Sequence, residues 1–357
     1  MNKNHKEFWL EYVFISTFVI MFLIIIRLLT PLFISPEPGF DTTNDHYHYI
    51  NMARNPFKPK VAIAPFCYRI LIPFIAWLMP FDLVTNFLII SFVSFYLTGI
   101  VLYFLLKEFF TKTLAVTGIT LFFSLRWTAM YFFYNIWLTE SLTFFFLVLC
   151  FWAINKSNLK IYAISLFFGV LTKEILLFTI PVLLISEFLK MKETNTFHKK
   201  YLLNSLFPIL PGLIIFIIIR IIIVPDPVWG YDYFYLIEKI GFNRRFTSII
   251  RFDFEFYYFC TIGTWGIILC FFPFFIKEDT FLHWVKLYGI FICLIYSQLL
   301  IASDIERIIV SGFYPMILLA LSGLENLKER KNINELIFLG ISLCYFIIQL
   351  ILHIFIF

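Results

Sequence analysis

Five charged residues interrupt stretches of sequence that are otherwise built from Leu, Ile, Phe and Val. They are Glu140, Lys173, Glu174, Asp304 and Arg307. A charge near the middle of a membrane helix costs about 2.5–3.5 kcal/mol on insertion scales, so such residues usually face a protein-lined or water-filled cavity and mark a functional site. We therefore expect these five side chains to take part in binding or chemistry.

Each of these charges also has a structural interpretation that the sequence leaves open. Lys173 and Glu174 could form a solvated turn, although the surrounding GVLTKEILLFTIP lacks the Gly, Asn or Asp that usually accompanies one. Asp304 and Arg307 are three residues apart and could form a local ion pair on one helix face. Glu140 could be an interface carboxylate with its head in water.

The segment FDTTNDHYHYINMARNP offers carboxylate and imidazole side chains. Asp41 and Asp45 are four residues apart and share a face if the segment is helical. Either carboxylate could act as a base, or the segment is an ordinary wet loop. Asp45, His46 and His48 are metal-ligand types, but there is no D-x-D motif and H-Y-H is not a helical ligand spacing. No cofactor is certain from these residues; a divalent metal is possible but not favoured.

Tyr68 and Arg69 follow this segment at the depth expected for lipid headgroups. The planar guanidinium of an arginine suits bidentate binding of phosphate. The alternative is an arginine that only anchors an interfacial helix.

The composition predicts a polytopic α-helical membrane protein. Of the 357 residues, 61% are hydrophobic and 14% are charged, whereas a soluble domain carries about 25% charged residues. The apolar stretches are continuous rather than alternating, which argues against a β-barrel. The net charge of +5 is no evidence for a nucleic-acid partner, because the basic residues fall mostly in short loops, as membrane topology requires.

The predicted fold class is an all-α transmembrane bundle of about eleven spans, forming one domain over residues 1–357. The apolar segments fall near 8–33, 83–106, 113–131, 136–154, 159–172, 174–189, 202–224, 256–276, 285–302, 308–324 and 335–357. Every loop predicted to be cytoplasmic then holds at least two Lys or Arg, which puts the amino terminus inside and the carboxyl terminus outside.

Residues 67–80 are apolar but short, bounded by proline, and carry Arg69. A crossing there would invert every later loop, so we expect an interfacial or re-entrant helix on the outer face. The outer loops 34–66 and 225–255 are the sizeable water-exposed segments, and no soluble domain is predicted. Any chemistry must therefore take place at the membrane.

This topology gathers the unusual charges on the outer side. Glu140 lies in the first turns of a span that enters from outside, and Lys173 and Glu174 form the tip of an outward hairpin. Asp304 and Arg307 lie between two spans that meet outside, and Arg126 lies near another outward end. A cluster of both signs, partly sunk in apolar helices, suggests a site for an amphiphilic anionic substrate.

Several short motifs resemble those of the GT-C superfamily of bacterial polytopic glycosyltransferases. An outer first loop with an Asp is followed by an aromatic-Tyr-Arg-x-Leu-x-Pro entry, here Tyr68, Arg69, Leu71 and Pro73. The likeness continues with a lysine–acid hairpin, here Thr172, Lys173, Glu174 and Pro181, and with a late outer segment, here Asp304, Arg307, Tyr314 and Pro315. The paired acidic signature of the first loop and the large soluble domain of several relatives are missing.

The resemblance implies inverting transfer of a sugar from a polyprenyl-phosphate donor to a lipid, glycan or protein acceptor outside a bacterial inner or plasma membrane. A first-loop carboxylate would act as the base, which we assign to Asp45 with Asp41 as the substitute. Arg69, Lys173 and Arg307 would stabilise the charge of the leaving phosphate. The alternatives are a transporter or flippase for a lipid-linked or anionic solute, and a non-catalytic assembly factor for cell-surface polymer.

Overall fold

The computed structural model describes residues 3–33, 45–56, 58, 65–193, 206–223, 254–271, 276–300 and 305–356. Within these ranges the chain forms helices and no β-strand. The predicted all-helical class is therefore confirmed for the described part of the chain.

Five helical segments of the described chain are long and apolar enough to cross a membrane. They comprise α1 (Lys3–Leu29), α4 (Leu83–Leu106), α17 (Glu278–Ser297), the run from α18 (Ile305–Ile309) through α19 (Phe313–Lys331), and α20 (Glu335–Ile356). Their outward faces expose large apolar side chains such as Leu28, Ile347 and Phe355. These features fit an integral membrane protein.

The remaining predicted spans coincide with shorter helices. They are α5 (Lys112–Ser124), α6 (Ala129–Tyr134), α7 (Glu140–Asn155), α8 (Leu159–Val170), α9 (Thr179–Glu193), α11 (Leu210–Ile222), α14 (Phe254–Cys260), α15 (Ile262–Trp265) and α16 (Ile268–Phe271). The segment predicted as one span over 113–131 is divided, because Thr128 donates its hydroxyl to the carbonyls of Phe122 and Leu125 and ends α5. Short helices of this kind are tolerated where protein covers their ends.

Helix α19 lies in the middle of the bundle, and every residue from Phe313 to Leu324 is buried. It packs against α5, α16 and α17. Phenylalanine rings from α4, α5, α6, α7 and α19 meet with centroids 4.7–6.4 Å apart; they are Phe95, Phe122, Phe132, Phe144 and Phe313. This apolar core fixes the start of α7 against α19.

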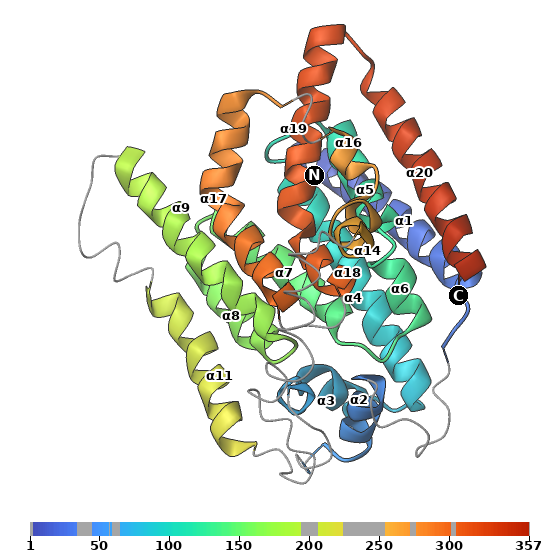
Figure 1. Cartoon of the computed structure of the whole chain (residues 1–357), viewed down its shortest axis with the longest axis vertical. Coiled ribbons are helices and arrows are strands. Elements are labelled where there is room, and N and C mark those ends of the chain that lie inside the picture. The colour runs from blue at the N-terminus through green and yellow to red at the C-terminus, as the bar shows by residue number, and fades with distance from the viewer. Residues whose placement is uncertain are drawn as a thin grey trace.

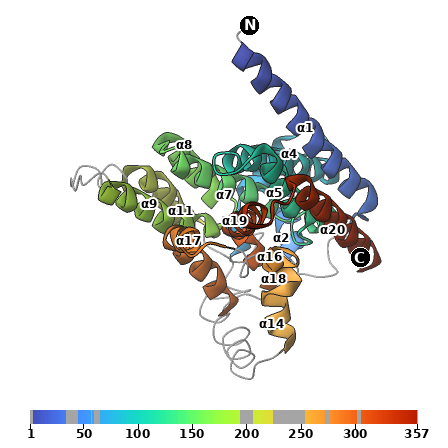
Figure 2. The ribbon, with the colours of Figure 1, turned by 90° about the horizontal axis from the view of Figure 1, so that it is seen from above.

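The two ends of the bundle differ in character (Figure 1). The basic carboxyl ends of α9 and α19 and the start of α17 lie at the upper end of that view, whereas the short helices α2 (Asp45–Arg54) and α3 (Leu71–Leu78) lie at the lower end. The view from above shows α8, α9, α11 and α17 on one side of α19 and α1 and α20 on the other (Figure 2).

Within the segment 34–66, which we predicted as an outer loop between spans, residues 45–54 form helix α2. Its residues Tyr49, Ile50 and Ala53 are buried in the same apolar cluster as Ile72 and Ala76 of α3. That packing supplies the stability that a short polar helix lacks by itself. The second outer loop lies mostly outside the described residues.

The predicted short helix at 67–80 consists of the 3-10 segment η2 (Phe66–Tyr68) and α3. At eight residues, α3 is too short to span a membrane. Phe74 and Trp77 are exposed on α3, and Phe81 is exposed just after it. Exposed aromatic rings of this kind are common at membrane interfaces.

Candidate functional site

Six charged side chains from five separate segments meet near the lower end of the bundle. Asp45 begins α2, Arg69 follows η2, Glu140 begins α7, Lys173 and Glu174 lie between α8 and α9, and Arg307 belongs to α18. The ion pairs among them join residues up to 262 positions apart in the sequence. We refer to these six residues as the charge network.

Glu140 is the centre of the charge network. Lys173 Nζ donates to Glu140 Oε1 at 2.7 Å, and Arg307 Nε lies 3.0 Å from the same oxygen. The side chain of Glu140 is only 1% exposed. Glu140 Oε2 has no hydrogen-bond partner within the described part of the chain. The buried Glu140 carboxylate thus binds two cations through Oε1, and its Oε2 can accept a hydrogen bond from a further donor.

Arg69 forms the second half of the charge network. Its Nε and NH2 donate to Glu174 Oε2 and Oε1 at 3.2 and 2.7 Å, and its NH1 donates to the Tyr49 hydroxyl at 3.0 Å. Burial opposes the charge of Arg69, but the Glu174 carboxylate more than compensates and raises the pKa of Arg69 well above its ordinary value. Arg69 therefore stays charged although it is buried.

The turn between α8 and η3 (Glu174–Phe178) positions Lys173 and Glu174. Thr172 donates its hydroxyl to Gly169 O at 2.6 Å and accepts from Thr143 Oγ1 of α7 at 3.1 Å. A Cβ atom at Gly169 would lie 2.6 Å from Leu176 Cγ, so glycine is needed for the turn to fold back onto α8. These contacts direct Lys173 toward the start of α7.

A backbone hydrogen bond of 3.1 Å from Leu71 N to Leu171 O joins the start of α3 to the same turn. It brings Arg69 beside Glu174. At the opposite edge, Arg307 NH2 contacts Asp45 Oδ2 and so connects α18 with α2. Asp45 also lies in the first turn of its helix, where the helix dipole favours a negative charge.

The charge network is electrically balanced and unevenly exposed. Three carboxylates (Asp45, Glu140, Glu174) face three cations (Arg69, Lys173, Arg307). The Asp45 and Glu174 side chains are 20% and 24% exposed, whereas Lys173 is 5% exposed. A ligand that approaches from outside would thus meet Asp45 and Glu174 before the buried centre.

The geometry excludes three of the structural alternatives. Lys173 is buried, so it is not part of a solvated turn, and Glu140 does not hold its head in water. Arg69 is bound to Glu174 and Tyr49 rather than serving only as a surface anchor. Arg307 pairs with Asp45 and Glu140.

The two predicted histidines of α2 are buried but lie outside the ion pairs described above. His48 stacks on Phe66 at 5.0 Å, and neither of its ring nitrogens has a hydrogen-bond partner in the part of the chain that the structure describes. Burial lowers the pKa of His48 below its ordinary value, against an opposing effect of Asp45. His46 packs edge-on against Phe33 at 5.1 Å.

The other predicted site residues lie around the charge network or outside the described chain. Arg126 lies over the Trp127 ring at 5.3 Å and has Glu306 as an electrostatic neighbour. Tyr68 turns its ring toward α11. Asp41 and Asp304 lie outside the described residues.

Sequence reasoning did not assign two residues beside Tyr68 and Arg69 to the site. Tyr49 lies one helical turn after Asp45. Because tyrosine is uncharged, only its spacing of four residues from Asp45 could have indicated that it belongs to the site. Arg220, in the last turn of α11, lies 4.6 Å over the Tyr68 ring and 3.6 Å over Phe216. Its unusual position in an apolar helix was the available signal.

Among the described residues, no group of three or more His, Cys, Asp or Glu is arranged to hold a metal ion. Comparisons of the chain with protein-family models, with curated proteins and with solved structures gave no match. The function must therefore be inferred from the geometry of the site.

Proposed function

We propose that this protein is a membrane glycosyltransferase of the GT-C kind. It transfers a sugar from a polyprenyl-phosphate donor to a lipid, glycan or protein acceptor at the outer face of the membrane. The proposal includes eleven spans, an amino terminus inside and a site on the outer side, as the loop charges favour.

The observation that carries the proposal is the contact of Asp45 with Arg307 at the exposed edge of the charge network. A partly exposed carboxylate and a cation thus lie within reach of one ligand. Glycosyl transfer from a lipid phosphate needs this pair of groups: a base for the acceptor hydroxyl and a cation for the leaving phosphate.

In the proposed step the acceptor oxygen attacks the anomeric carbon of the donor. The bond from that carbon to the phosphate oxygen breaks, and its electron pair leaves with the polyprenyl phosphate. Asp45 takes the proton of the acceptor hydroxyl. Inversion at the anomeric carbon follows from this single displacement, and no general acid is required because phosphate departs readily.

The ion pairs of the charge network determine the order of events: the donor phosphate binds first, and the base is released afterwards. Before the donor binds, Arg307 holds the Asp45 carboxylate in an ion pair, so the carboxylate does not face the acceptor hydroxyl. When the donor phosphate takes the place of Asp45 on Arg307, the carboxylate is released toward the acceptor. Lys173 and Arg69 keep their own carboxylate partners and hold the surrounding helices in place.

The test uses the full chain purified into lipid nanodiscs, with polyprenyl-phosphate sugars as donors and a panel of hydroxyl acceptors. We expect transfer by the native protein and a loss of about 10²-fold or more in Asp45→Asn, the usual contribution of a general base. Asp279→Asn, an exposed carboxylate at the start of α17, is the matched control and should retain activity.

Absence of transfer to every acceptor, together with an Asp45→Asn variant that complements cells as well as the native protein, would refute the enzyme. Uptake of lipid-linked sugar across proteoliposomes without transfer would instead identify a flippase. Addition of EDTA separates a metal-dependent reaction from the metal-free one proposed here, because transfer should continue in its presence.

A further inference from the structure

The imidazole of His48 is a buried polar group to which the proposed reaction assigns no role. The side chain is only 4% exposed. Its ring lies parallel to Phe66, with centroids 5.0 Å apart, and meets the Tyr47 ring edge-on at 5.7 Å. These two rings fix the plane of the imidazole. In the part of the chain that the structure describes, neither ring nitrogen has a hydrogen-bond partner. Because such a buried group is costly, a ligand is a physical reason for its presence.

His48 lies one helical turn from the proposed base. Asp45 and His48 are three residues apart in α2, so they share a face of the helix with Cβ atoms about 5–6 Å apart. The Arg69 guanidinium lies over the same Phe66 ring at 5.6 Å, and Arg69 also donates to the hydroxyl of Tyr49. The imidazole is thus held beside the charge network, next to its partly exposed carboxylate.

A second buried polar atom without a partner lies beside Arg307. Arg307 contacts Asp45, and its Nε lies 3.0 Å from Glu140 Oε1. Glu140 Oε2 has no hydrogen-bond partner among the described residues. The ion pair at which the acceptor would react therefore has an unsatisfied carboxylate oxygen beyond Arg307 and an unsatisfied imidazole one turn beyond Asp45.

The hydrogen-bonding capacity of these atoms defines the ligand. A carboxylate oxygen only accepts, whereas a neutral imidazole donates through one nitrogen and accepts through the other. A phosphate offers acceptor oxygens, so it would satisfy the imidazole N–H but neither the second nitrogen nor Glu140 Oε2. A hydroxyl group donates and accepts at once. A ligand with several hydroxyls is therefore the chemistry that satisfies all three atoms.

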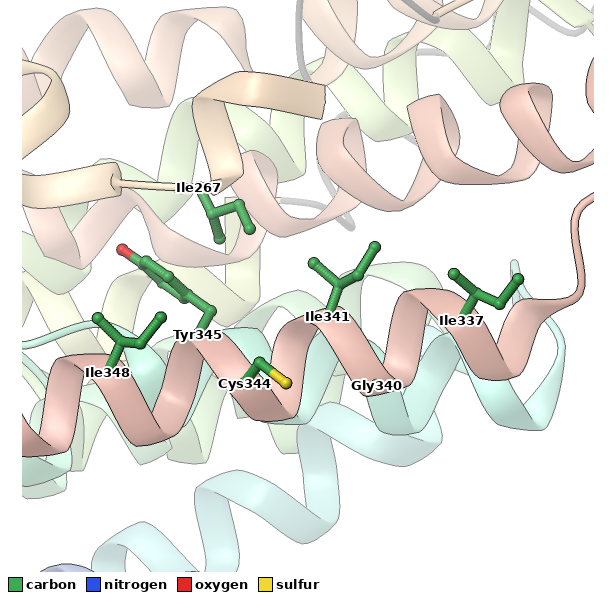
Figure 3. Close-up of a pocket in the computed structure, with 7 residues that line it drawn as sticks. All are labelled: Ile267, Ile337, Gly340, Ile341, Cys344, Tyr345 and Ile348. Carbon is green, nitrogen blue, oxygen red and sulfur yellow. The ribbon is translucent and has the colours of Figure 1, made fainter.

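The pocket against α20 has a different character (Figure 3). There Ile267 faces Ile337 and Ile341 of a helix that is long and apolar enough to cross a membrane. The Tyr345 hydroxyl in its lining already accepts a hydrogen bond from Gln349 Nε2 at 2.9 Å. A ligand rich in hydroxyls matches the groups on α2 better than this aliphatic surface.

We infer that His48 binds a hydroxyl of the acceptor beside the one that Asp45 deprotonates, and that the acceptor is a glycan. The inference depends on the proposed function and narrows its three classes of acceptor to one. Groups one helical turn apart fit two hydroxyls of one sugar, whereas the single hydroxyl of a serine or an alkanol would engage Asp45 alone. His48 takes no proton in the transfer; it holds the sugar in place.

The first experiment compares acceptors on the native chain in nanodiscs, with a polyprenyl-phosphate sugar as donor. The acceptors are hexyl glycosides of glucose, galactose, mannose and N-acetylglucosamine, and hexanol as the matched single hydroxyl. We expect kcat/KM for at least one glycoside to exceed that for hexanol at least about tenfold, an effect within reach of one or two hydrogen bonds. Equal use of all glycosides and hexanol would overturn the inference without any variant, and so even if a His48 variant fails to fold.

The second experiment removes the imidazole. His48→Phe keeps the stacking on Phe66 and should raise the KM for the glycoside at least about tenfold, with kcat and the KM for hexanol unchanged. His48→Gln, which keeps a donor and an acceptor, should recover part of the loss. His283→Phe, at an exposed histidine of α17, is the control and should behave as the native protein. A rise in the KM for the donor instead would place the bound hydroxyl on the donor sugar and overturn the inference.

Binding without a donor separates this inference from the proposed function. Saturation-transfer NMR with the corresponding methyl glycosides, which stay in water, should show contact with the native chain and not with His48→Phe. That result without any sugar transfer would refute the enzyme and keep the glycan site. Sugar transfer that His48→Phe leaves unchanged would refute the glycan site and keep the enzyme.

Discussion

At the scale of single residues, the most consequential group is the buried Glu140 carboxylate. Taking a charge out of water costs several kcal/mol, and a buried pair recovers that cost only when both partners are present. Lys173 and Arg307 both contact one oxygen of Glu140. Removing that carboxylate leaves two like charges facing each other in an apolar environment.

We predict that Glu140→Gln lowers the stability of the protein by about 3–5 kcal/mol, the usual effect of breaking a buried pair. Glu108→Gln is the control, because Glu108 pairs with Lys156 at the surface. Its loss should cost about 0–1 kcal/mol. Thermal unfolding in detergent, followed by tryptophan fluorescence, measures both variants.

The double variant Glu140→Gln/Lys173→Met separates electrostatics from packing. Because it removes the uncompensated lysine, it should unfold at a higher temperature than Glu140→Gln alone. If Glu140→Gln and Glu108→Gln unfold at the same temperature, the charge network does not hold the helices together.

His48 gives the site a pH dependence with a definite sign. Its pKa is lowered by burial, so the unfolded chain binds the proton more readily than the folded one. Stability is therefore complete above the unfolded pKa of about 6.5 and is lost as the pH falls from there to the folded value. We predict that the melting temperature falls less between pH 7.5 and 5.5 in His48→Phe, which keeps the stacking on Phe66.

His283→Phe is the control for this measurement, because His283 is an exposed histidine of α17. Its pH profile should follow the native profile. A His48→Phe profile that also matches the native one would show that protonation of this imidazole does not act on folding.

At the scale of elements, helix α11 depends on a close approach to α8. A Cβ atom at Gly212 would lie 2.5 Å from Leu166 Cγ, so a larger residue forces the two helices apart. Further along α11, Ile219 and Ile223 are buried together with Cys67, Met52 and Leu171. This second apolar cluster holds α11 against η2 and keeps Arg220 over Tyr68.

We predict that Gly212→Ile lowers stability by about 1–3 kcal/mol through overpacking and exposes Cys67 to a maleimide. The experiment uses a chain in which the exposed cysteines Cys270, Cys293 and Cys344 are serine. Buried Cys150 of α7 is an internal control and should stay unreactive. Labelling of Cys67 at the native rate would contradict the proposed role of the α8–α11 contact.

Helix α2 illustrates what the sequence pattern could not predict at this scale. Its polar composition and the preceding Asp- and Thr-rich residues are typical of a loop. The helix forms because Tyr49, Ile50 and Ala53 find an apolar surface on α3. That surface belongs to the tertiary structure, so local propensity left the conformation of this segment open, whereas the long apolar helices were predicted correctly.

At the scale of the whole molecule, loop-charge counting predicted that the unusual charges gather, and the described contacts bring four of the five, Glu140, Lys173, Glu174 and Arg307, together with Asp45 and Arg69. It could not predict the partners. A local pair of Arg307 with Asp304 was an open alternative that lies outside the described residues; among the described residues, Arg307 pairs with Asp45 and Glu140. Pairing between residues hundreds of positions apart depends on helix packing, for which a single sequence gives no distance information.

Counting the loop charges also predicts which end of the bundle faces the outside of the cell. Labelling one residue at each end of the bundle tests this prediction. Phe81, just before α4, and Lys331, the last residue of α19, are both exposed. The start of α4 and the end of α19 lie at opposite ends of the bundle (Figure 1). In a chain without native cysteines, Phe81→Cys should react with an impermeant maleimide on intact bacterial cells, and Lys331→Cys should react only after permeabilisation. The basic end of α19 stays inside because positive charges are retained in the cytoplasm. If both cysteines react on intact cells, the eleven-span topology is wrong, and Asp45 and Arg307 lose their proposed access to an acceptor outside.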